Sequence, residues 1–290
     1  MTARAVTVSM LKGGTTKSTV AAHTAEALSR QGKRVLAIDT DPNGHLTTNL
    51  GHNDRYYGDG PDLGDVILES GSATPNDIIV DTGLGFDLIP STEALETVES
   101  NLRNQMQPSM ALRENIVEPL LGDAYDHIVI DTHSSRNMLV NNAVVAAPNL
   151  LVPVTPEQGI YSGLRRTRER IIDPLQGKIG LDILAFVPNK LRSRIDQRTD
   201  DRELLQRICT DETLAAKVPN FAYISPEQWE AIDAGKLNPL PKPGIRFNKT
   251  IEKAYREQQT LGAYAPDDPG LEHWDEVAEI VIKGEVVRDD

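Results

Sequence analysis

The stretch that decides the fold is residues 5–19, which read AVTVSMLKGGTTKST. It begins with a short run rich in β-branched side chains, which is typical of a β-strand. The turn Gly13-Gly14 follows, and Lys17 then opens a segment that continues through an alanine-rich apolar run at residues 20–28. The sequence therefore predicts a strand, a glycine-containing loop and a helix, in that order.

A loop of this kind suits the binding of a polyphosphate. The glycines allow backbone N–H groups to turn toward the ligand, and the N-terminus of the following helix adds partial positive charge. Lys17 is long enough to reach the β- and γ-phosphates, and the Ser18 hydroxyl is placed to ligate Mg²⁺. The literal pattern G-x-x-x-x-G-K-[ST] is not met, because Leu11 and Thr16 stand at its two glycine positions. A plain strand-to-helix turn with a surface lysine remains the alternative for this stretch alone.

The segment Lys-Gly-Gly-x-x-Lys-Ser-Thr, which starts at Lys12, resembles the deviant Walker A box of the ParA/MinD family of ATPases, with its additional signature lysine. The resemblance implies ATP and Mg²⁺ as cofactors, and a set of loop residues that contact the nucleotide: Gly13, Gly14, Thr15, Thr16, Lys17, Ser18 and Thr19. Family members usually have glycine at the position of Thr16. A β-branched residue is costly there if φ is positive, so either the loop keeps to a region that threonine tolerates or nucleotide affinity suffers.

Composition limits the class of protein. Hydrophobic side chains make up 39% of the 290 residues and charged side chains 25%, which is ordinary for a globular protein. No apolar run approaches the roughly 18 residues of a membrane span, and the start of the chain lacks the apolar core of a signal peptide. The single cysteine, Cys209, excludes an internal disulfide framework. We therefore expect a cytoplasmic protein.

Strongly apolar strands are expected at residues 33–39 and 126–131, with further strands at 149–154 and 181–187. The order strand, helix, strand near the start of the chain forms a βαβ unit, which implies a parallel sheet. Weaker patterns predict a short strand at 77–80 and a loop-rich region from Val218 through the proline-rich residues 238–244. With no internal repeat and no long linker, we expect a single P-loop NTPase-type domain over residues 1–290. Its fold would be doubly wound α/β, with a mostly parallel sheet and helices on both faces.

Three carboxylates follow predicted strands. Asp131 ends the strand at 126–131 and fits the Walker B position, where a carboxylate holds Mg²⁺ beside a bound triphosphate. In the motif Asp39-Thr40-Asp41-Pro42, the family resemblance assigns to Asp41 the orientation of the attacking water and to Asp39 a supporting role on the Mg²⁺ side. Each carboxylate has a plain alternative as a turn-forming residue.

The resemblance assigns roles to three more residues. The family's signature lysine crosses a dimer interface to the partner subunit's phosphates, which implies that role for Lys12 and an ATP-dependent homodimer. Asn189, after the strand at 181–187 and Pro188, resembles the asparagine that reads adenine, and the backbone near Pro219 is expected to flank the base. A turn-forming asparagine is the alternative for Asn189.

The expected partners follow from the same family. ParA-type members bind DNA non-specifically as ATP dimers and respond to a ParB-like centromere-binding protein. The net charge of −13 argues against the whole surface binding nucleic acid, but residues 161–209 carry eleven Lys/Arg and seven Asp/Glu. Arg194, Arg198 and Arg202 would form a stripe if one helix carried all three, and Arg165, Arg166, Arg168 and Arg170 crowd another. A salt-bridged, solvated face is the alternative. The acidic end of the chain, Glu285–Asp290, argues against a membrane partner.

The sequence thus indicates a ParA-like, slow and partner-stimulated ATP hydrolase that acts in plasmid or chromosome partitioning and associates with the nucleoid. Two alternatives remain open. One is a binding module that uses nucleotide as a dimer switch and barely turns over. The other is an ATPase that positions a cargo other than DNA.

Overall fold

The computed structural model describes residues 2–288, and the strands in this range form one seven-stranded sheet. Their order across the sheet is β3 (Val80–Asp81), β4 (Asp87–Ile89), β2 (Val35–Asp39), β5 (His127–Asp131), β1 (Arg4–Val8), β6 (Asn149–Val154) and β7 (Asp182–Pro188). Neighbouring strands pair in parallel except β3, which runs antiparallel to β4. The expected mostly parallel sheet is confirmed.

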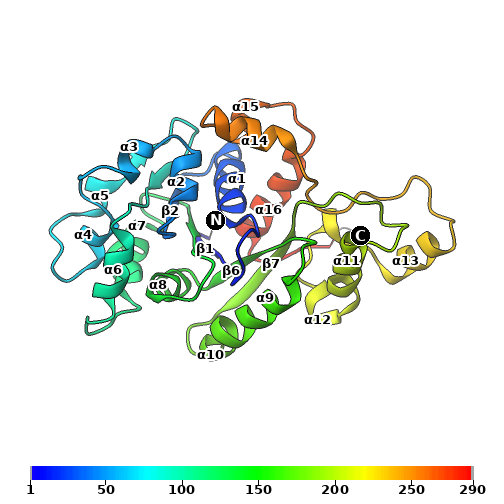
Figure 1. Cartoon of the computed structure of the whole chain (residues 1–290), viewed down its shortest axis with the longest axis horizontal. Helices are drawn as coiled ribbons and strands as arrows, with labels where there is room; N and C mark the ends of the chain where they lie inside the picture. The colour runs from blue at the N-terminus through cyan, green and yellow to red at the C-terminus, as the bar shows by residue number, and fades with distance from the viewer. Residues whose placement is uncertain (1, 289–290) are drawn as a thin grey trace.

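Helices cover both faces of this sheet (Figure 1). Helices α1 (Lys17–Arg30) and α16 (Leu271–Lys283) pack on one face against apolar side chains of β1, β2 and β7. On the other face lie α8 (Met138–Ala146), α9 (Ile160–Thr167) and α11 (Asp200–Thr210). Successive side chains of a strand point to opposite faces, so each central strand contributes to both cores. The doubly wound α/β fold is confirmed.

The remaining helices connect the strands or follow the last one. They are α2 (His45–Asn49), α3 (Asn53–Tyr56), α4 (Leu63–Ile67), α5 (Pro75–Ile78), α6 (Leu95–Leu102), α7 (Glu118–Leu120), α10 (Asp173–Leu175), α12 (Glu212–Ala215), α13 (Pro226–Asp233), α14 (Lys249–Arg256) and α15 (Leu261–Tyr264). Two π-helical turns, η1 (Arg113–Val117) and η2 (Arg168–Ile172), and one 3₁₀ turn, η3 (Asn220–Ala222), complete the described elements. Over residues 2–288 no helix has the length and apolarity that crossing a membrane would need. The end of the chain, Asp289 and Asp290, lies outside the described residues.

The strand expected at residues 77–80 is wrong for its first half, which belongs to α5. The backbone N–H and the hydroxyl of Thr74 both donate to Asp77 Oδ2, at 2.8 and 2.7 Å, and Pro75 lies in the first turn. This capping box stabilises a helical turn, because it satisfies the free N–H group that the end of a helix leaves. Only Val80 and Asp81 remain for the strand.

The arginine stripe expected from residues 194 to 202 does not form on one helix. Thr199 caps the N-terminus of α11 by accepting a hydrogen bond from the Arg202 N–H, so the helix begins at Asp200. Arg194 therefore lies in the preceding loop, where it pairs with Asp196. Because the cap starts the helix at Asp200, Arg194 and Arg198 precede it and do not share a helix face with Arg202.

His23 joins α1 to the C-terminal part of the chain. Its Nδ1 lies 2.8 Å from the Thr19 carbonyl, and its Nε2 accepts a hydrogen bond from the Leu261 N–H at 3.2 Å. Its ring also stacks on Trp274 of α16, with centroids 4.9 Å apart. These contacts suit a neutral imidazole with its proton on Nδ1, because a second ring proton would face the Leu261 N–H. Burial lowers the pKa of His23, while nearby Glu26 raises it to a smaller extent.

We predict that His23 makes the protein less stable in mild acid. The folded-state pKa is lowered, so protonation favours the unfolded chain, and stability is lost as the pH falls below about 6.5. The free energy of unfolding, measured by urea titration from pH 7.5 to pH 5 (roughly), should fall more steeply in the wild type than in His23→Gln. The slopes should differ by up to about 1.4 kcal/mol per pH unit. Equal slopes would contradict the assignment of this pH dependence to His23, since the other histidines are present in both proteins.

Candidate functional site

The loop between β1 and α1 is held by hydrogen bonds between backbone and side-chain groups. The Leu11 N–H donates to Thr167 Oγ1 of α9 at 2.9 Å, and Thr15 Oγ1 donates to the Lys12 carbonyl at 3.1 Å. Gly14 has a φ of 77°, in the left-handed region. No acidic residue lies in the first turn of α1, so nothing there offsets the partial positive charge of the helix N-terminus. The local geometry is that of an anion-binding loop.

Thr16 adopts the left-handed conformation, with φ 62° and ψ 29°. The loop therefore does not keep to a region that suits threonine, and the first of the two expectations for this residue is wrong. Its carbonyl accepts the Val20 N–H, which starts α1, so the conformation is fixed by the beginning of the helix. Left-handed backbone at a β-branched residue costs on the order of 1–3 kcal/mol. The phosphate loop stores this strain.

Lys17 and Asp131 are brought together behind the loop. The Lys17 side chain is almost fully buried, and burial lowers its pKa, while the charges of Asp131 and Asp41 raise it. Burial also raises the pKa of Asp131 well above its usual range, with a further increase from Asp39. Asp131 Oδ1 accepts the Thr132 N–H, and Oδ2 is buried with no hydrogen-bond partner.

The unpartnered Asp131 oxygen fits a divalent cation. A buried carboxylate oxygen without a donor is costly unless a ligand satisfies it. The Ser18 side chain lies near the same carboxylate and lowers its pKa. A hydroxyl, one carboxylate and nucleotide phosphates are the donor set that Mg²⁺ takes in nucleotide sites.

The two aspartates after β2 have different surroundings. Both oxygens of Asp39 are occupied: Oδ1 accepts the Asp41 N–H, and Oδ2 accepts the N–H and the hydroxyl of Thr47 at 2.9 and 2.7 Å. Burial raises the pKa of Asp39 to about 7, although the Thr47 hydrogen bonds oppose the shift. Asp41 instead lines the pocket, where its Oδ1 accepts from the backbone and side chain of Asn43.

The pocket beside the loop has a volume of about 530 Å³. It brings together most of the residues that the sequence singles out, namely Gly13, Gly14, Thr15, Thr16, Lys17, Ser18, Thr19, Asp41 and Asn189. Asn189 is held at the end of β7 by its N–H bond to the Val154 carbonyl, and its Oδ1 accepts the Lys190 N–H. Its Nδ2 is buried without a partner, so one amide donor remains for a ligand.

Four predicted residues do not line this pocket. Asp39 and Asp131 are fully buried near it. Lys12 is directed elsewhere, with Nζ 3.1 Å from Glu157 Oε2. Pro219 is buried and does not line the pocket, and its expected place beside the base stays a prediction. Residues 244–247 run along the end of β7, through bonds between Ile245 and Pro188 and between Phe247 and Leu191.

Sequence reasoning missed the wall that these residues form with α14. Arg246, Phe247, Asn248, Ile251, Glu252 and Tyr255 line the pocket, together with Asn43, His45, Asn49, Ser134 and Lys190. A partial signal for the wall was present, since Ile251 and Tyr255 are four residues apart and share one face of α14, although Phe247 lies before the start of that helix. The fold alone reveals that this face turns toward the phosphate loop.

Comparisons with known proteins agree with this geometry. A family model described as an AAA domain matches residues 3–179. The chromosome partitioning protein ParA of Caulobacter vibrioides is 34% identical over 199 residues, 67% of this chain and 73% of that protein. The maintenance of carboxysome distribution protein A of Synechococcus elongatus is 29% identical over 247 residues, 79% and 89% of the two chains.

Among solved structures, the septum site-determining protein MinD of Pyrococcus horikoshii, complexed with Mg-ADP, has a TM-score of 0.68 and 26% identity. The match covers 98% of this chain and 97% of that one. A phosphate loop between strand and helix, with carboxylates at neighbouring strand ends, defines a P-loop nucleotide-binding protein. The chain belongs to the matched family and is a ParA/MinD-type P-loop ATPase. Its cofactors are ATP and Mg²⁺.

We predict that Thr16→Gly stabilises the protein. Relief of the left-handed strain outweighs the greater backbone entropy of glycine in the unfolded chain, for a net gain of about 1 kcal/mol. Thermal unfolding should shift upward by about 2 °C. The control is Thr15→Gly, which loses the hydrogen bond to the Lys12 carbonyl without relieving a positive φ, and should be less stable. A lower melting temperature for Thr16→Gly would contradict the account.

Proposed function

We propose that the chain is a ParA-like ATPase for DNA partitioning, which forms a dimer with ATP, binds DNA non-specifically and is reset by slow hydrolysis. The observation that carries the proposal is the pocket, which Lys17 and Asp41 line, together with Asp131, which is buried near it with one oxygen without a partner. Hydrolysis of a γ-phosphate needs mainly positioning and neutralisation of charge, and these groups supply both. The 34% identity to a chromosome partitioning ParA supports the choice of DNA as cargo.

Each site residue takes a distinct role in this proposal. Lys17 and the loop N–H groups bind the phosphates, and Asp41 orients the attacking water. Ser18 and Asp131 hold Mg²⁺, which neutralises charge on the phosphates when it is bound. Asp39 has no free oxygen for a metal, so we assign it a positioning role: it holds residues 41–47 and thereby fixes Asp41.

Lys12 is proposed to reach the nucleotide of a second copy. In the single chain its ammonium pairs with Glu157, whose side chain is 43% exposed, so the contact is open to exchange. An exposed ion pair contributes only about 0–1 kcal/mol, and transfer of the lysine to a triphosphate easily offsets its loss. Nucleotide at the interface then favours the dimer by mass action.

Sedimentation velocity with and without Mg-ATP tests this proposal. The wild type should be a dimer only with ATP. Lys12→Ala should stay monomeric, because it lacks the contact across the interface. Asp41→Ala should stay dimeric for longer than the wild type, because hydrolysis is lost. The matched control is Lys178→Ala, which removes an exposed lysine far from Lys12 in the sequence and should behave as the wild type. A dimer that forms regardless of nucleotide would refute the switch.

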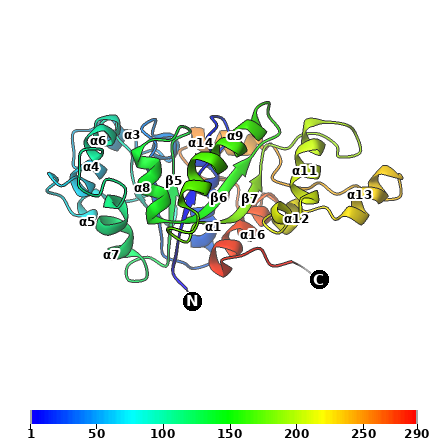
Figure 2. The ribbon, with the colours of Figure 1, turned by 90° about the horizontal axis from the view of Figure 1, so that it is seen from below.

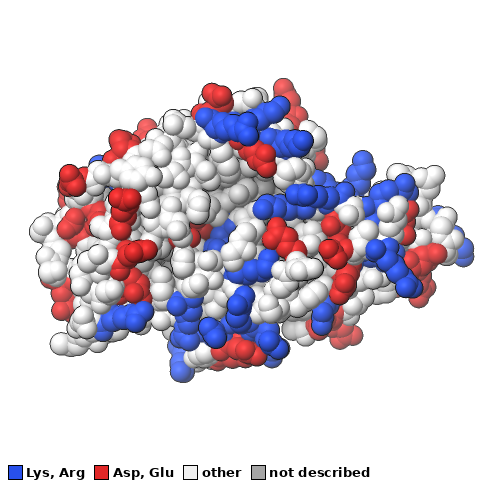
Figure 3. Space-filling model, viewed as in Figure 1, with Lys and Arg blue, Asp and Glu red and all other residues white. Residues whose placement is uncertain are grey.

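As the surface that binds DNA, we propose the basic side chains of α9 and η2. Figure 3 shows blue side chains gathered at the lower edge of the molecule with red ones among them, in the region that α9 and α10 occupy in Figure 1. Arg165 and Arg168 pair with Glu169 and Asp173, at 3.9 and 3.4 Å. Arg166 and Arg170 are exposed and make no ion pair among residues 2–288. These two, four residues apart, are the better candidates for phosphate contacts.

Retention on non-specific duplex DNA with Mg-ATP checks this surface. Affinity should fall at least ten-fold between about 50 and 200 mM salt, because counterions are released on binding. It should also weaken in Arg166→Ala/Arg170→Ala, while Arg103→Ala, at a different surface, should have no effect. Failure to bind DNA even at low salt would favour a positioning ATPase for another cargo, a function supported by the 29% identity to a carboxysome distribution protein.

In the DNA proposal, the protein is cytoplasmic, nucleoid-associated and stimulated by a ParB-like partner, and residues 1–290 act as one domain.

A further inference from the structure

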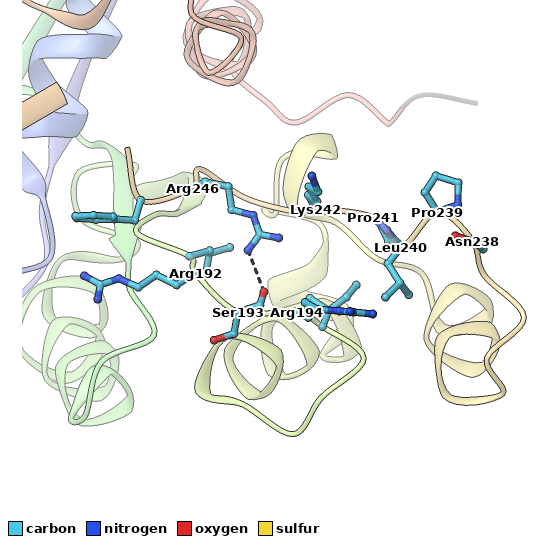
Figure 4. A pocket seen from close by; sticks show the side chains of 12 residues that line it. Arg192, Ser193, Arg194, Asn238, Pro239, Leu240, Pro241, Lys242 and Arg246 are labelled. Carbon is cyan, nitrogen blue, oxygen red and sulfur yellow. Dashed lines mark hydrogen bonds between the residues drawn. The ribbon is translucent and has the colours of Figure 1, made fainter. Parts of the chain in front are cut away.

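Two segments that border the nucleotide pocket are held by contacts from outside it. On one side, Arg246 donates to the Ser193 carbonyl at 3.1 Å, in a neighbouring groove of about 690 Å³, as Figure 4 shows. On the other side lies the turn of residues 41–44, which carries Asp41. Figure 2 shows α3 and α14 at the edge of the molecule away from the N-terminus, where the carboxyl ends of the parallel strands meet. The last residue of α3, Tyr56, contacts the turn.

The turn at residues 41–44 leaves one oxygen of Asp41 free. The Gly44 N–H donates to the Asp41 carbonyl at 2.8 Å, with Pro42 between them, and these residue types are favoured in such a turn. Asp41 Oδ1 accepts the backbone N–H and the side-chain amide of Asn43, at 2.9 and 2.8 Å. Asp41 Oδ2 accepts no hydrogen bond in the described part of the chain, so it is the oxygen left to orient a water molecule.

Tyr56 holds the peptide group from which Asn43 donates. The Tyr56 hydroxyl donates to the Pro42 carbonyl at 2.8 Å. That carbonyl and the Asn43 N–H belong to one planar peptide unit, so a hydrogen bond at one end fixes the direction of the other. A chain of hydrogen bonds therefore runs from the Tyr56 hydroxyl through this peptide to Asp41 Oδ1, and its members polarise one another. Burial raises the pKa of Tyr56, so the hydroxyl keeps the proton that it donates.

The Tyr56 ring restricts the same turn at Gly44. Gly44 has a φ of 59°, and a Cβ at this position would overlap Cε2 of the ring, so only glycine fits. Tyr56 is itself tied down, because its carbonyl accepts the Glu93 N–H at 3.3 Å. Ser91 Oγ donates to the Asp41 carbonyl at 2.7 Å. The segment after β4 thus holds both the turn and the tyrosine that packs on it.

We propose that Tyr56 is a positioning residue for ATP hydrolysis: its hydroxyl fixes the Pro42–Asn43 peptide, which in turn holds Asp41 with one oxygen free to orient the attacking water. Tyr56 does not line the nucleotide pocket, so it acts on the hydrolytic step and not on nucleotide binding. The inference rests on the proposed function, because it requires that Asp41 orients the water.

Steady-state hydrolysis of Mg-ATP, together with calorimetry of a non-hydrolysable ATP analogue, tests this role. Tyr56→Phe should lower kcat about five-fold, as expected for the loss of one hydrogen bond, and should leave the affinity for the analogue unchanged. Tyr56→Leu should be slower still, because the ring that packs on Gly44 is also lost. In the Asp41→Ala background, Tyr56→Phe should lower kcat no further, because the tyrosine acts through Asp41.

The matched control is Tyr57→Phe. Tyr57 is 65% exposed and packs edge-on against Tyr56, with ring centroids 4.8 Å apart, so it lies beside the proposed contact without making it. Loss of its hydroxyl should change neither kcat nor the affinity for the analogue.

The outcomes separate the two proposals. If Tyr56→Phe hydrolyses ATP as fast as the wild type, or loses affinity for the analogue along with activity, positioning by Tyr56 is refuted while the phosphate site stands. An additive loss in the double variant would refute action through Asp41. If Asp41→Ala alone hydrolyses ATP as the wild type does, the proposed function itself fails. Circular dichroism of each variant distinguishes loss of fold from loss of catalysis.

Discussion

The pairing of β5 with both β1 and β2 is the constraint on which the site depends. In the sheet register Asp131 stands opposite Val8 of β1 and opposite Asp39 of β2. Because all three strands are parallel, their carboxyl ends meet at one edge, and the phosphate loop after β1 lies next to Asp131, with Asp39 on the far side of β5. A change of register by one residue would turn Asp131 to the other face of the sheet. The backbone pairing of β2 with β5 thus brings together two residues that are far apart in the sequence, Asp39 and Asp131.

The protein does not satisfy all of the charged groups at this edge of the sheet, and their arrangement suits the binding of a ligand. Lys17 is buried with Asp131, and one oxygen of that carboxylate has no donor. The strain at Thr16 points the same way, because natural proteins keep such strain mainly where a function depends on the conformation. Asp39 contributes indirectly, since its hydrogen bonds to Thr47 fix the loop that carries Asp41. Unmet hydrogen-bonding capacity and stored strain coincide at one pocket.

The parts of this account that the sequence predicts are those encoded locally. The strand, loop and helix of residues 5–28 follow from a short-range pattern, and the carboxylates follow strands that are recognisable from apolar runs. The parts that it misses depend on contacts between distant residues. The Lys12–Glu157 pair joins positions 145 residues apart, and the wall at 246–255 meets the loop only after the sheet has formed. The strand predicted at residues 77–80 is wrong for the opposite reason, because a local capping box at Thr74 and Asp77 overrode a weak strand pattern.

The most direct test of the central claim is titration calorimetry of the wild type and of Lys17→Ala with ATP in the presence of Mg²⁺. The account predicts saturable binding of one ATP per chain by the wild type. It also predicts affinity at least ten-fold weaker in Lys17→Ala, because a charge-assisted contact to the phosphates is lost. Absence of any ATP binding by the folded wild type, or equal affinity in Lys17→Ala, would contradict the claim that this loop binds a triphosphate.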